Sequence, residues 1–186
     1  MTAWLFPGQG SQRRGMGADL LSAFPELCAT ADAILGYPVA ELCLEDPEGR
    51  LGQTRYAQPA LFFVSALAWL ARPDRDHGPR FLAGHSLGEY NALLAGGCFD
   101  FATGLRLVRR RGELMSEAAT GGMLAVLGLD ADELRALLER AGADDVDLAN
   151  HNARTQLVLS GPRESLARAA RSIEQESPRA RLVPSR

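Results

Sequence analysis

The apolar positions along this chain change their spacing at about residue 120. Before it, short apolar runs at residues 3–6 and 81–83 alternate with helix-compatible stretches at residues 60–71, 89–94 and 101–119. The short runs have the length and composition of buried strands. Residues 1–120 are therefore expected to form an α/β layer fold.

Two of these helices carry more detailed expectations. Proline is favoured in the first turn of a helix, so Pro59 is expected at the start of the helix over residues 60–71. Along residues 101–119, the side chains of Leu105, Val108 and Met115 are expected to point into the core.

The pattern of apolar and polar positions over residues 121–186 predicts a second, smaller domain. A hinge is expected at residues 120–122. Strands are expected at residues 123–129, 146–149, 156–160 and 181–183, with a polar turn between the second and the third. A helix is expected before the second strand and another before the fourth. This strand–helix–strand–strand–helix–strand order is typical of a ferredoxin-like fold.

The two helices of the small domain have recognisable ends and faces. Asp130, with Glu133 three residues later, predicts a capping box at the start of the first helix, and Gly142 ends it. Gly161 and Pro162 open the second helix. The residues expected to face the core are Leu134, Leu137, Leu138 and Ala141 on the first helix and Leu166, Ala169, Ala170 and Ile173 on the second.

The amino-acid composition excludes several classes of function. The 186 residues are 46% hydrophobic and 23% charged, which is ordinary for a globular protein. A net charge of −3 gives no footprint for nucleic acid, and neither a signal peptide nor a membrane-spanning run is expected, so the interpretation is a cytoplasmic protein. All basic residues are arginine, which excludes Schiff-base lysine chemistry. Cys28, Cys43 and Cys98 are expected to be reduced, mostly buried thiols and not metal ligands.

The segment G-H-S-L-G-E-Y at residues 84–90 lies between a predicted strand and a predicted helix. Gly84 and Gly88 flank Ser86 in the G-x-S-x-G spacing of a nucleophile elbow, a strained strand-to-helix turn. Glycines are needed there because a Cβ would clash with the neighbouring backbone. Such a turn exposes the Ser86 hydroxyl and aims the Leu87 N–H at a developing oxyanion. The alternative is an ordinary serine at the start of a helix.

A second glycine-rich segment, P-G-Q-G-S-Q at residues 7–12, follows the first predicted strand. Such a loop can present backbone N–H groups to an anion. It has no Gly-Lys-Ser/Thr as in a P-loop, and Arg13 stands where the dinucleotide pattern G-x-G-x-x-G requires its third glycine. Neither nucleotide-binding motif is therefore indicated.

Together these two segments resemble the malonyl-CoA:acyl-carrier-protein transacylase family, which includes the acyltransferases of fatty-acid and polyketide synthases. Further segments match that family in order and spacing: Q-P-A-L at 58–61, R-G-E-L-M at 111–115, G-M-L-A-V at 122–126 and N-H-N at 150–152. The resemblance spans essentially the whole chain. It implies an α/β-hydrolase-like core, with residues 1–120 as its N-terminal part, and an inserted ferredoxin-like subdomain over residues 121–186.

The resemblance also implies roles for individual residues. Ser86 would attack the thioester of malonyl-CoA, and the phosphopantetheine thiol of an acyl carrier protein would resolve the resulting acyl-serine. The N–H groups of Leu87 and Gln9 would hold the oxyanion, and Arg111 would fork onto the malonyl carboxylate. No bound cofactor, metal or nucleic acid is implied.

The interpretation of several further residues is less direct. Consecutive helical residues point about 100° apart, so at most one residue of 109–111 can face the pocket, and Arg111 is the one expected. His85 is expected to leave the elbow in another direction and to play a supporting role. Gln58 is either a pocket residue or a polar group at a helix start. Asn150 and Asn152 either approach the acyl site or form a turn.

The general base is the part of the site that this sequence does not show. The family supplies it from a histidine shortly after the last strand of the small subdomain. Here V-P-S-R occupies residues 183–186, where some members carry V-P-S-H, and a permanently protonated Arg186 cannot serve as a base. The closing strands of the core are also expected beyond this point, so the sequence is interpreted as truncated.

The leading hypothesis is an acyltransferase that moves a malonyl or related group from CoA to a carrier protein. One alternative is an acyl hydrolase that clears acyl groups from carrier proteins, although an arginine in the pocket favours carboxylated acyl groups. The other alternative is a non-catalytic carrier-binding fragment, motivated by the absent histidine.

Overall fold

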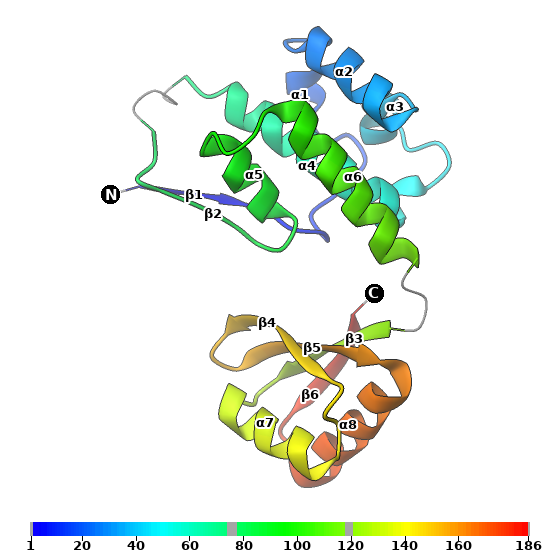
Figure 1. Ribbon diagram of the computed structural model, residues 1–186, viewed down its shortest axis with the longest axis vertical. Coiled ribbons are helices and arrows are strands. Elements are labelled where there is room, and N and C mark those ends of the chain that lie inside the picture. The colour runs from blue at the N-terminus through cyan, green and yellow to red at the C-terminus, as the bar shows by residue number, and fades with distance from the viewer. Residues whose placement is uncertain (1, 74–77, 118–120, 186) are drawn as a thin grey trace. The chain divides into compact units, whose positions relative to one another are not determined.

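The computed structural model describes residues 2–73, 78–117 and 121–185. Its chain divides into two compact units, Met1–Glu117 and Ala118–Arg186, which are described separately below (Figure 1). This division falls close to the predicted boundary between residues 120 and 121.

Unit 1 consists of helices packed around a pair of short strands (Figure 1). In chain order its elements are β1 (Ala3–Phe6), α1 (Ala18–Leu21), α2 (Pro25–Leu35), α3 (Val39–Leu44), a 3-10 turn η1 (Arg50–Gly52), α4 (Thr54–Leu70), β2 (Phe81–Gly84), α5 (Gly88–Ala95) and α6 (Phe101–Glu117). The two strands predicted in this part are thus present, and the layer fold is α/β.

Strands β1 and β2 are parallel, with Ala3 opposite Phe81 and Phe6 opposite Gly84. Phe6 is buried, and the Trp4 ring lies edge-on to Trp69 of α4 with centroids 5.9 Å apart. The alternate positions point to the other face of this small sheet. There the side chains of Leu5 and Phe81 are 72% and 53% exposed, so one face of the sheet is open in unit 1.

The core of unit 1 lies between α4 and α6, which pack against each other along their length. Helix α4 contributes the buried Phe62, Phe63 and Leu67, and α6 contributes Leu105 and Val108. The predicted core positions on α6 are confirmed for these two residues.

Met115, in contrast, is 45% exposed, so its predicted place in the core is wrong. Helix α6 is longer than the part of the core that it covers, and Met115 lies in its last turns, past the core contacts.

The predicted start of α4 is also wrong, because the helix begins at Thr54 and Pro59 lies inside it. Proline has no N–H, so the carbonyl of Arg55 lacks its usual helical donor. The packing of α6 at this turn is close, since a Cβ on Gly112 would lie 3.2 Å from the Arg55 Cα. Burial of Ala57, Pro59 and their apolar neighbours offsets the cost of the interior proline.

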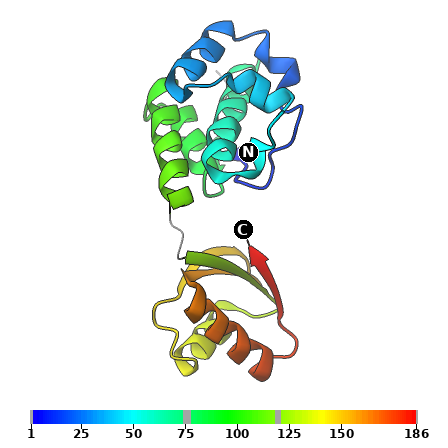
Figure 2. The same ribbon diagram turned by 90° about the vertical axis from the view of Figure 1, so that its right-hand side faces the viewer.

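Unit 2 has the element order β3 (Gly121–Leu127), α7 (Ala131–Arg140), β4 (Asp147–Ala153), β5 (Gln156–Pro162), α8 (Arg163–Glu176) and β6 (Arg181–Ser185). The strands form one antiparallel sheet in the order β4-β5-β3-β6. Both helices cover the same face of that sheet (Figures 1 and 2). The predicted order of strands and helices in this part of the chain is confirmed.

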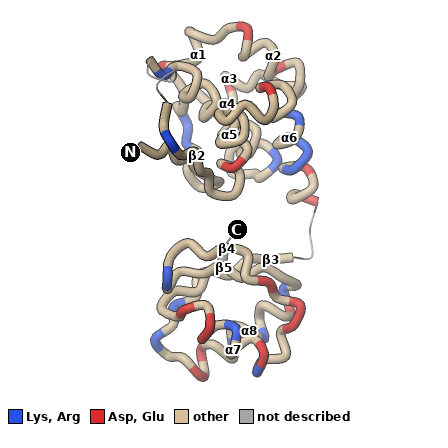
Figure 3. The backbone as a smooth tube through the Cα atoms, turned by 60° about the vertical axis from the view of Figure 1, so that its left-hand side comes forward, with Lys and Arg blue, Asp and Glu red and all other residues tan. Residues whose placement is uncertain are grey.

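The core of unit 2 is separate from that of unit 1. Alternating residues of β3 and β5, such as Leu124, Val126 and Leu157, are buried against the apolar faces of α7 and α8. All the residues predicted for those two faces are buried or packed against this core. Many of the other positions on both helices are acidic or basic residues (Figure 3), and Arg140 pairs with Glu176 at 2.8 Å.

The three cysteines are all free, but they differ in exposure. Cys43 is buried and Cys28 is half-buried, as expected, whereas Cys98 is exposed because it follows the end of α5 at the surface. Burial raises the pKa of the Cys43 thiol to about 12, so this thiol is not a nucleophile at neutral pH. No described helix combines the length and apolar character needed to cross a membrane.

Candidate active site

Ser86 lies at the turn between β2 and α5, as the G-x-S-x-G spacing predicts. Its φ angle is +53°, in the left-handed region that side chains other than glycine rarely adopt. Strain of this kind persists only where the surrounding structure fixes the backbone, and it is concentrated at functional sites. The turn therefore has the backbone form of a nucleophile elbow.

Gly84 and Gly88 allow this turn because the backbone passes too close for a side chain. A Cβ on Gly84 would lie 2.0 Å from the carbonyl carbon of Gly88. A Cβ on Gly88 would lie 2.2 Å from the carbonyl oxygen of Phe6. Both contacts are with backbone, which cannot move aside as a flexible side chain can, so the predicted steric requirement is confirmed at both positions.

The N-terminal loop packs directly on the elbow. The His85 N–H donates to the Phe6 carbonyl at 3.1 Å. A Cβ on Gly8 would lie 2.8 Å from Nδ1 of His85, so the imidazole rests against the backbone of this loop. The loop after β1 and the turn after β2 thus pack against each other. This packing places Gln9 beside the elbow.

The predicted oxyanion donors are the backbone N–H groups of Leu87 and Gln9. Leu87 is buried, and its N–H precedes the first hydrogen-bonded turn of α5. Within the described part of the chain, neither the Leu87 N–H nor the Gln9 N–H donates to a backbone carbonyl. Both groups therefore keep their donor capacity for another acceptor.

Arg111 reaches Ser86 from α6. Its Nη2 donates to the Ser86 Oγ at 2.9 Å, and its Nη1 donates to Oε1 of Gln58 at 2.6 Å. The guanidinium carbon also lies 6.0 Å from the centroid of the Tyr90 ring on α5. The sequence-based choice of Arg111 thus agrees with the position of the side chain beside the serine.

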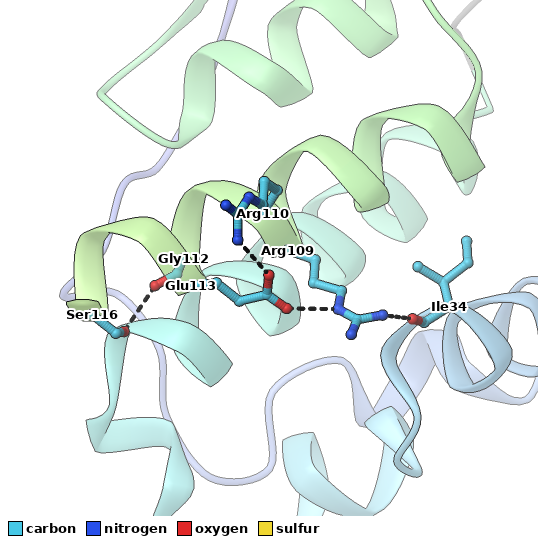
Figure 4. A network of polar contacts seen from close by, with 6 residues as sticks. All are labelled: Ile34, Arg109, Arg110, Gly112, Glu113 and Ser116. Carbon is cyan, nitrogen blue, oxygen red and sulfur yellow. Dashed lines mark hydrogen bonds and ion pairs between the residues drawn. The ribbon is translucent and has the colours of Figure 1, made fainter.

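Arg109 and Arg110 instead make their contacts with Glu113, on the same helix (Figure 4). The Nε of Arg109 donates to Glu113 at 2.9 Å, and its Nη1 donates to the Ile34 carbonyl. Arg110 makes a longer pair with the same carboxylate, at 3.5 Å. The contacts of Glu113 with these two arginines, led by the hydrogen bond from Arg109, lower the pKa of the Glu113 carboxyl. The Glu113 carboxylate thus pairs with two arginines of its own helix.

Gln58 lies in the second turn of α4 and is 0% exposed. Its Nε2 donates to Oε1 of Gln9 at 3.4 Å and to Sδ of Met115 at 3.2 Å. It is therefore the buried member of a partly exposed polar group around Arg111, and the interpretation as a polar residue at a helix start is wrong.

Two members of this group were not anticipated. Thr54 accepts a hydrogen bond from Nε2 of Gln9 at 3.1 Å, and Met115 accepts from Gln58. Thr54 and Gln58 are four residues apart on α4, as Arg111 and Met115 are on α6, so each pair shares a helix face. That spacing was available in the sequence, but the expected start of α4 at Pro59 concealed the first pair.

Asn150 and Asn152 lie on strand β4 of unit 2, so the turn expected at these residues is wrong. Asn150 pairs with Val158, on the sheet face opposite the one that carries the buried Leu157 and Leu159. A register irregularity separates it from Leu148, and a second one lies between His151 and Ala153. These irregularities let two polar residues sit within a strand that also contributes to the core.

Within unit 1, the structure thus brings together Ser86, Gln9, Gln58 and Arg111. Across the described residues, no group of three or more His, Cys, Asp or Glu side chains could hold a metal ion. Arg186, the residue compared above with the histidine of V-P-S-H, lies outside the described residues, as does His77.

Comparison with known proteins decides the family. A family model described as an acyl transferase domain matches residues 3–184. The chain belongs to this family. The acyl transferase model therefore covers both units and includes the elbow serine, the loop before it and α6.

Curated members of the acyl transferase family resemble the chain along most of its length. It is 54% identical over 176 residues to the polyketide biosynthesis protein ThaF of Burkholderia thailandensis. It is 50% identical over 175 residues to the polyketide biosynthesis malonyl CoA-acyl carrier protein transacylase PksC of Bacillus subtilis. Each match covers 94% of this chain, but only 15% of ThaF and 61% of PksC.

A solved structure agrees with this assignment. The malonyl CoA-acyl carrier protein transacylase from Burkholderia pseudomallei is 48% identical, with a TM-score of 0.88 over 98% of this chain and 63% of that one. The chain therefore spans less than two thirds of the length of the relatives that it matches.

Proposed function

We propose that this chain acts in the transfer of a malonyl group from CoA to the phosphopantetheine thiol of an acyl carrier protein. The observation that carries the proposal is the 2.9 Å hydrogen bond between Arg111 Nη2 and Ser86 Oγ. It places a permanent cation beside a serine on a strained turn, where an acyl group with a free carboxylate would have both of its ends recognised.

The reaction takes two steps through an acyl-serine. Ser86 Oγ attacks the thioester carbonyl and gives its proton to a base, and the tetrahedral oxyanion accepts from the N–H groups of Leu87 and Gln9. The CoA sulfur leaves with a proton. The carrier thiol then attacks the acyl-serine ester, and Ser86 Oγ leaves and is reprotonated. Arg111 orients the malonyl carboxylate but cannot be the base, because a guanidinium stays protonated.

The proposed architecture is an α/β-hydrolase-like core with a ferredoxin-like subdomain. Residues 1–120 would form the N-terminal part of the core, and residues 121–186 would form the subdomain, whose sheet order β4-β5-β3-β6 fits that fold. The open sheet face at Leu5 and Phe81 supports further core segments outside residues 1–186, since such a face is normally covered.

Two observations favour transfer over the alternatives. A cation beside the nucleophile suits a carboxylated acyl group, whereas a hydrolase that clears plain acyl groups has no use for it. The relative PksC is named as a malonyl CoA-acyl carrier protein transacylase in polyketide biosynthesis, which also supports an acyl carrier protein as the partner. Asn150 and Asn152 are proposed as further substrate contacts and His85 as a supporting residue.

Acylation of Ser86 tests this function directly. The full-length gene product is incubated briefly with malonyl-CoA, and its intact mass is measured. We expect a rise of one malonyl group, which the Ser86→Ala variant lacks and a carrier protein with free phosphopantetheine removes. Ser116→Ala is the matched control, because Ser116 Oγ donates only to the Gly112 carbonyl, at 2.8 Å (Figure 4).

Two results would contradict the proposal. A modified peptide that does not contain Ser86 would remove the elbow from the mechanism. Loss of the malonyl group to water at the same rate with and without the carrier protein would identify a hydrolase.

A further inference from the structure

The orientation of the Gln58 amide is set by its neighbours. The Sδ of Met115 is an acceptor only, so it must face the NH₂ end of the Gln58 amide. The same NH₂ group donates to Oε1 of Gln9, whose own NH₂ is directed to Thr54. The Gln58 carbonyl oxygen is thereby turned to Arg111, which donates to it at 2.6 Å.

Both hydrogen-bond partners of Arg111, the Gln58 amide oxygen and the Ser86 hydroxyl, are therefore neutral acceptors, although the arginine side chain is only partly exposed. The neighbouring Arg109 and Arg110 both pair with the carboxylate of Glu113. Among the described residues, no ion pair involves Arg111. An arginine held by an amide keeps its full charge, whereas one held by a carboxylate is already neutralised before a ligand arrives.

We propose that Gln58 is a positioning residue that determines acyl specificity by holding Arg111 without neutralising it. One edge of the guanidinium is fixed on the amide oxygen, and the other edge faces Ser86 with its charge available to a substrate carboxylate. The hydrogen bond to Gln9 joins this arrangement to the loop that supplies an oxyanion donor. The inference rests on the proposed function and explains why the proposed transferase would prefer carboxylated acyl groups.

The isosteric Gln58→Glu variant tests the inference, because it keeps an oxygen beside Arg111 and adds only a negative charge. In the full-length gene product, the ratio of kcat/KM for malonyl-CoA to that for acetyl-CoA should fall at least about tenfold. Gln58→Met removes the acceptor without adding charge, so its ratio should fall between that of Gln58→Glu and the wild type. Acetyl transfer, which does not use the guanidinium charge, should change much less.

Two controls separate specificity from folding. Gln53→Glu adds the same charge to the exposed residue that directly precedes α4, five positions before Gln58, and should leave the ratio unchanged. In an Arg111→Ala background, Gln58→Glu should have no further effect on the ratio. If Gln58→Glu does not fold, the ratio of Gln58→Met decides.

The outcomes distinguish this inference from the function on which it rests. If Arg111→Ala lowers the ratio but the Gln58 variants lower malonyl and acetyl transfer equally, Gln58 is merely structural and only this inference fails. An unchanged ratio in both Gln58 variants has the same consequence. If the wild type transfers neither acyl group, the proposed function fails as well.

Discussion

The hydroxyl of Ser86, the proposed nucleophile, is hydrogen-bonded to the residue proposed to bind the substrate carboxylate, Arg111. Arg111 Nη2 lies 2.9 Å from the hydroxyl oxygen, in the place where a substrate carboxylate would need a donor. Binding of a malonyl group would exchange this contact for a pair of charge-assisted bonds, which are stronger than a bond to a neutral hydroxyl. The serine would then be released at the moment when its substrate is in place.

We expect Arg111→Ala to shift the acyl preference from malonyl to acetyl. Loss of a charge-assisted pair should lower kcat/KM for malonyl-CoA by about 10- to 150-fold and leave that for acetyl-CoA nearly unchanged. Steady-state transfer to a carrier protein with each acyl-CoA measures this. Arg111→Lys, which keeps the charge but not the fork, should show an intermediate loss. Equal losses with both acyl-CoAs would show that Arg111 only supports the helix packing.

At the scale of single elements, the sequence correctly predicted the helices and strands whose ends are marked by local sequence motifs. The strand before Ser86, the helix after it and the capping box at Asp130 all follow from local chemistry. Helix α4 was predicted too short because its first turn depends on tertiary packing that overrides an interior proline. Strand β4 was likewise ended too early, because its polar residues 150–152 are held by pairing with β5.

The contrast between local signals and tertiary contacts also explains how much of the candidate site could be predicted from the sequence. Ser86 was predicted from the G-x-S-x-G spacing, and Arg111 from the resemblance to the transacylase family. The contacts of Gln58 with Gln9 and Met115 join three distant segments, and no local pattern reports which of several polar residues will meet across two helices.

The capping box of α7 gives a prediction for stability. The Asp130 carboxylate accepts from the N–H groups of Asp132 and Glu133 at 3.1 and 3.0 Å. Asp130→Ala should lower the free energy of unfolding of unit 2 by about 1 kcal/mol. Urea unfolding followed by circular dichroism measures it. Asp132→Ala, an exposed change in the same turn, should cost clearly less, and equal costs would show that charge near the helix start matters more than the cap.

The whole molecule has two separate cores, and the residues gathered around Ser86 in unit 1 lack a recognisable base. The group there consists of Arg111, Gln58 and Gln9, of which none accepts a proton at neutral pH. The chain has only three histidines: His77, His85 and His151. Efficient catalysis by residues 1–186 would therefore require His85 or another of these to take the Ser86 proton.

We expect a polypeptide of residues 1–186 to transfer malonyl groups several orders of magnitude more slowly than the full-length gene product, because loss of one member of a catalytic unit has that effect. Transfer to a carrier protein measures both rates under the same conditions. His85→Ala is the informative companion: it should change little in the full-length protein. Comparable rates for the two chains, abolished by His85→Ala or His151→Ala, would identify the base within this sequence.

The pairing of β1 with β2 has a consequence for the order in which the molecule forms. Ala3 lies opposite Phe81, so the whole segment from α1 to α4 separates two adjacent strands. Closing so long a loop costs entropy that only later contacts repay, and parallel pairing of distant segments is slow. During synthesis, the loop that carries Gln9 has no strand beside it until β2 has left the ribosome. The serine and its proposed oxyanion donors therefore come together only when β2 pairs with β1, and a nascent chain that ends before β2 lacks the proposed acylation centre.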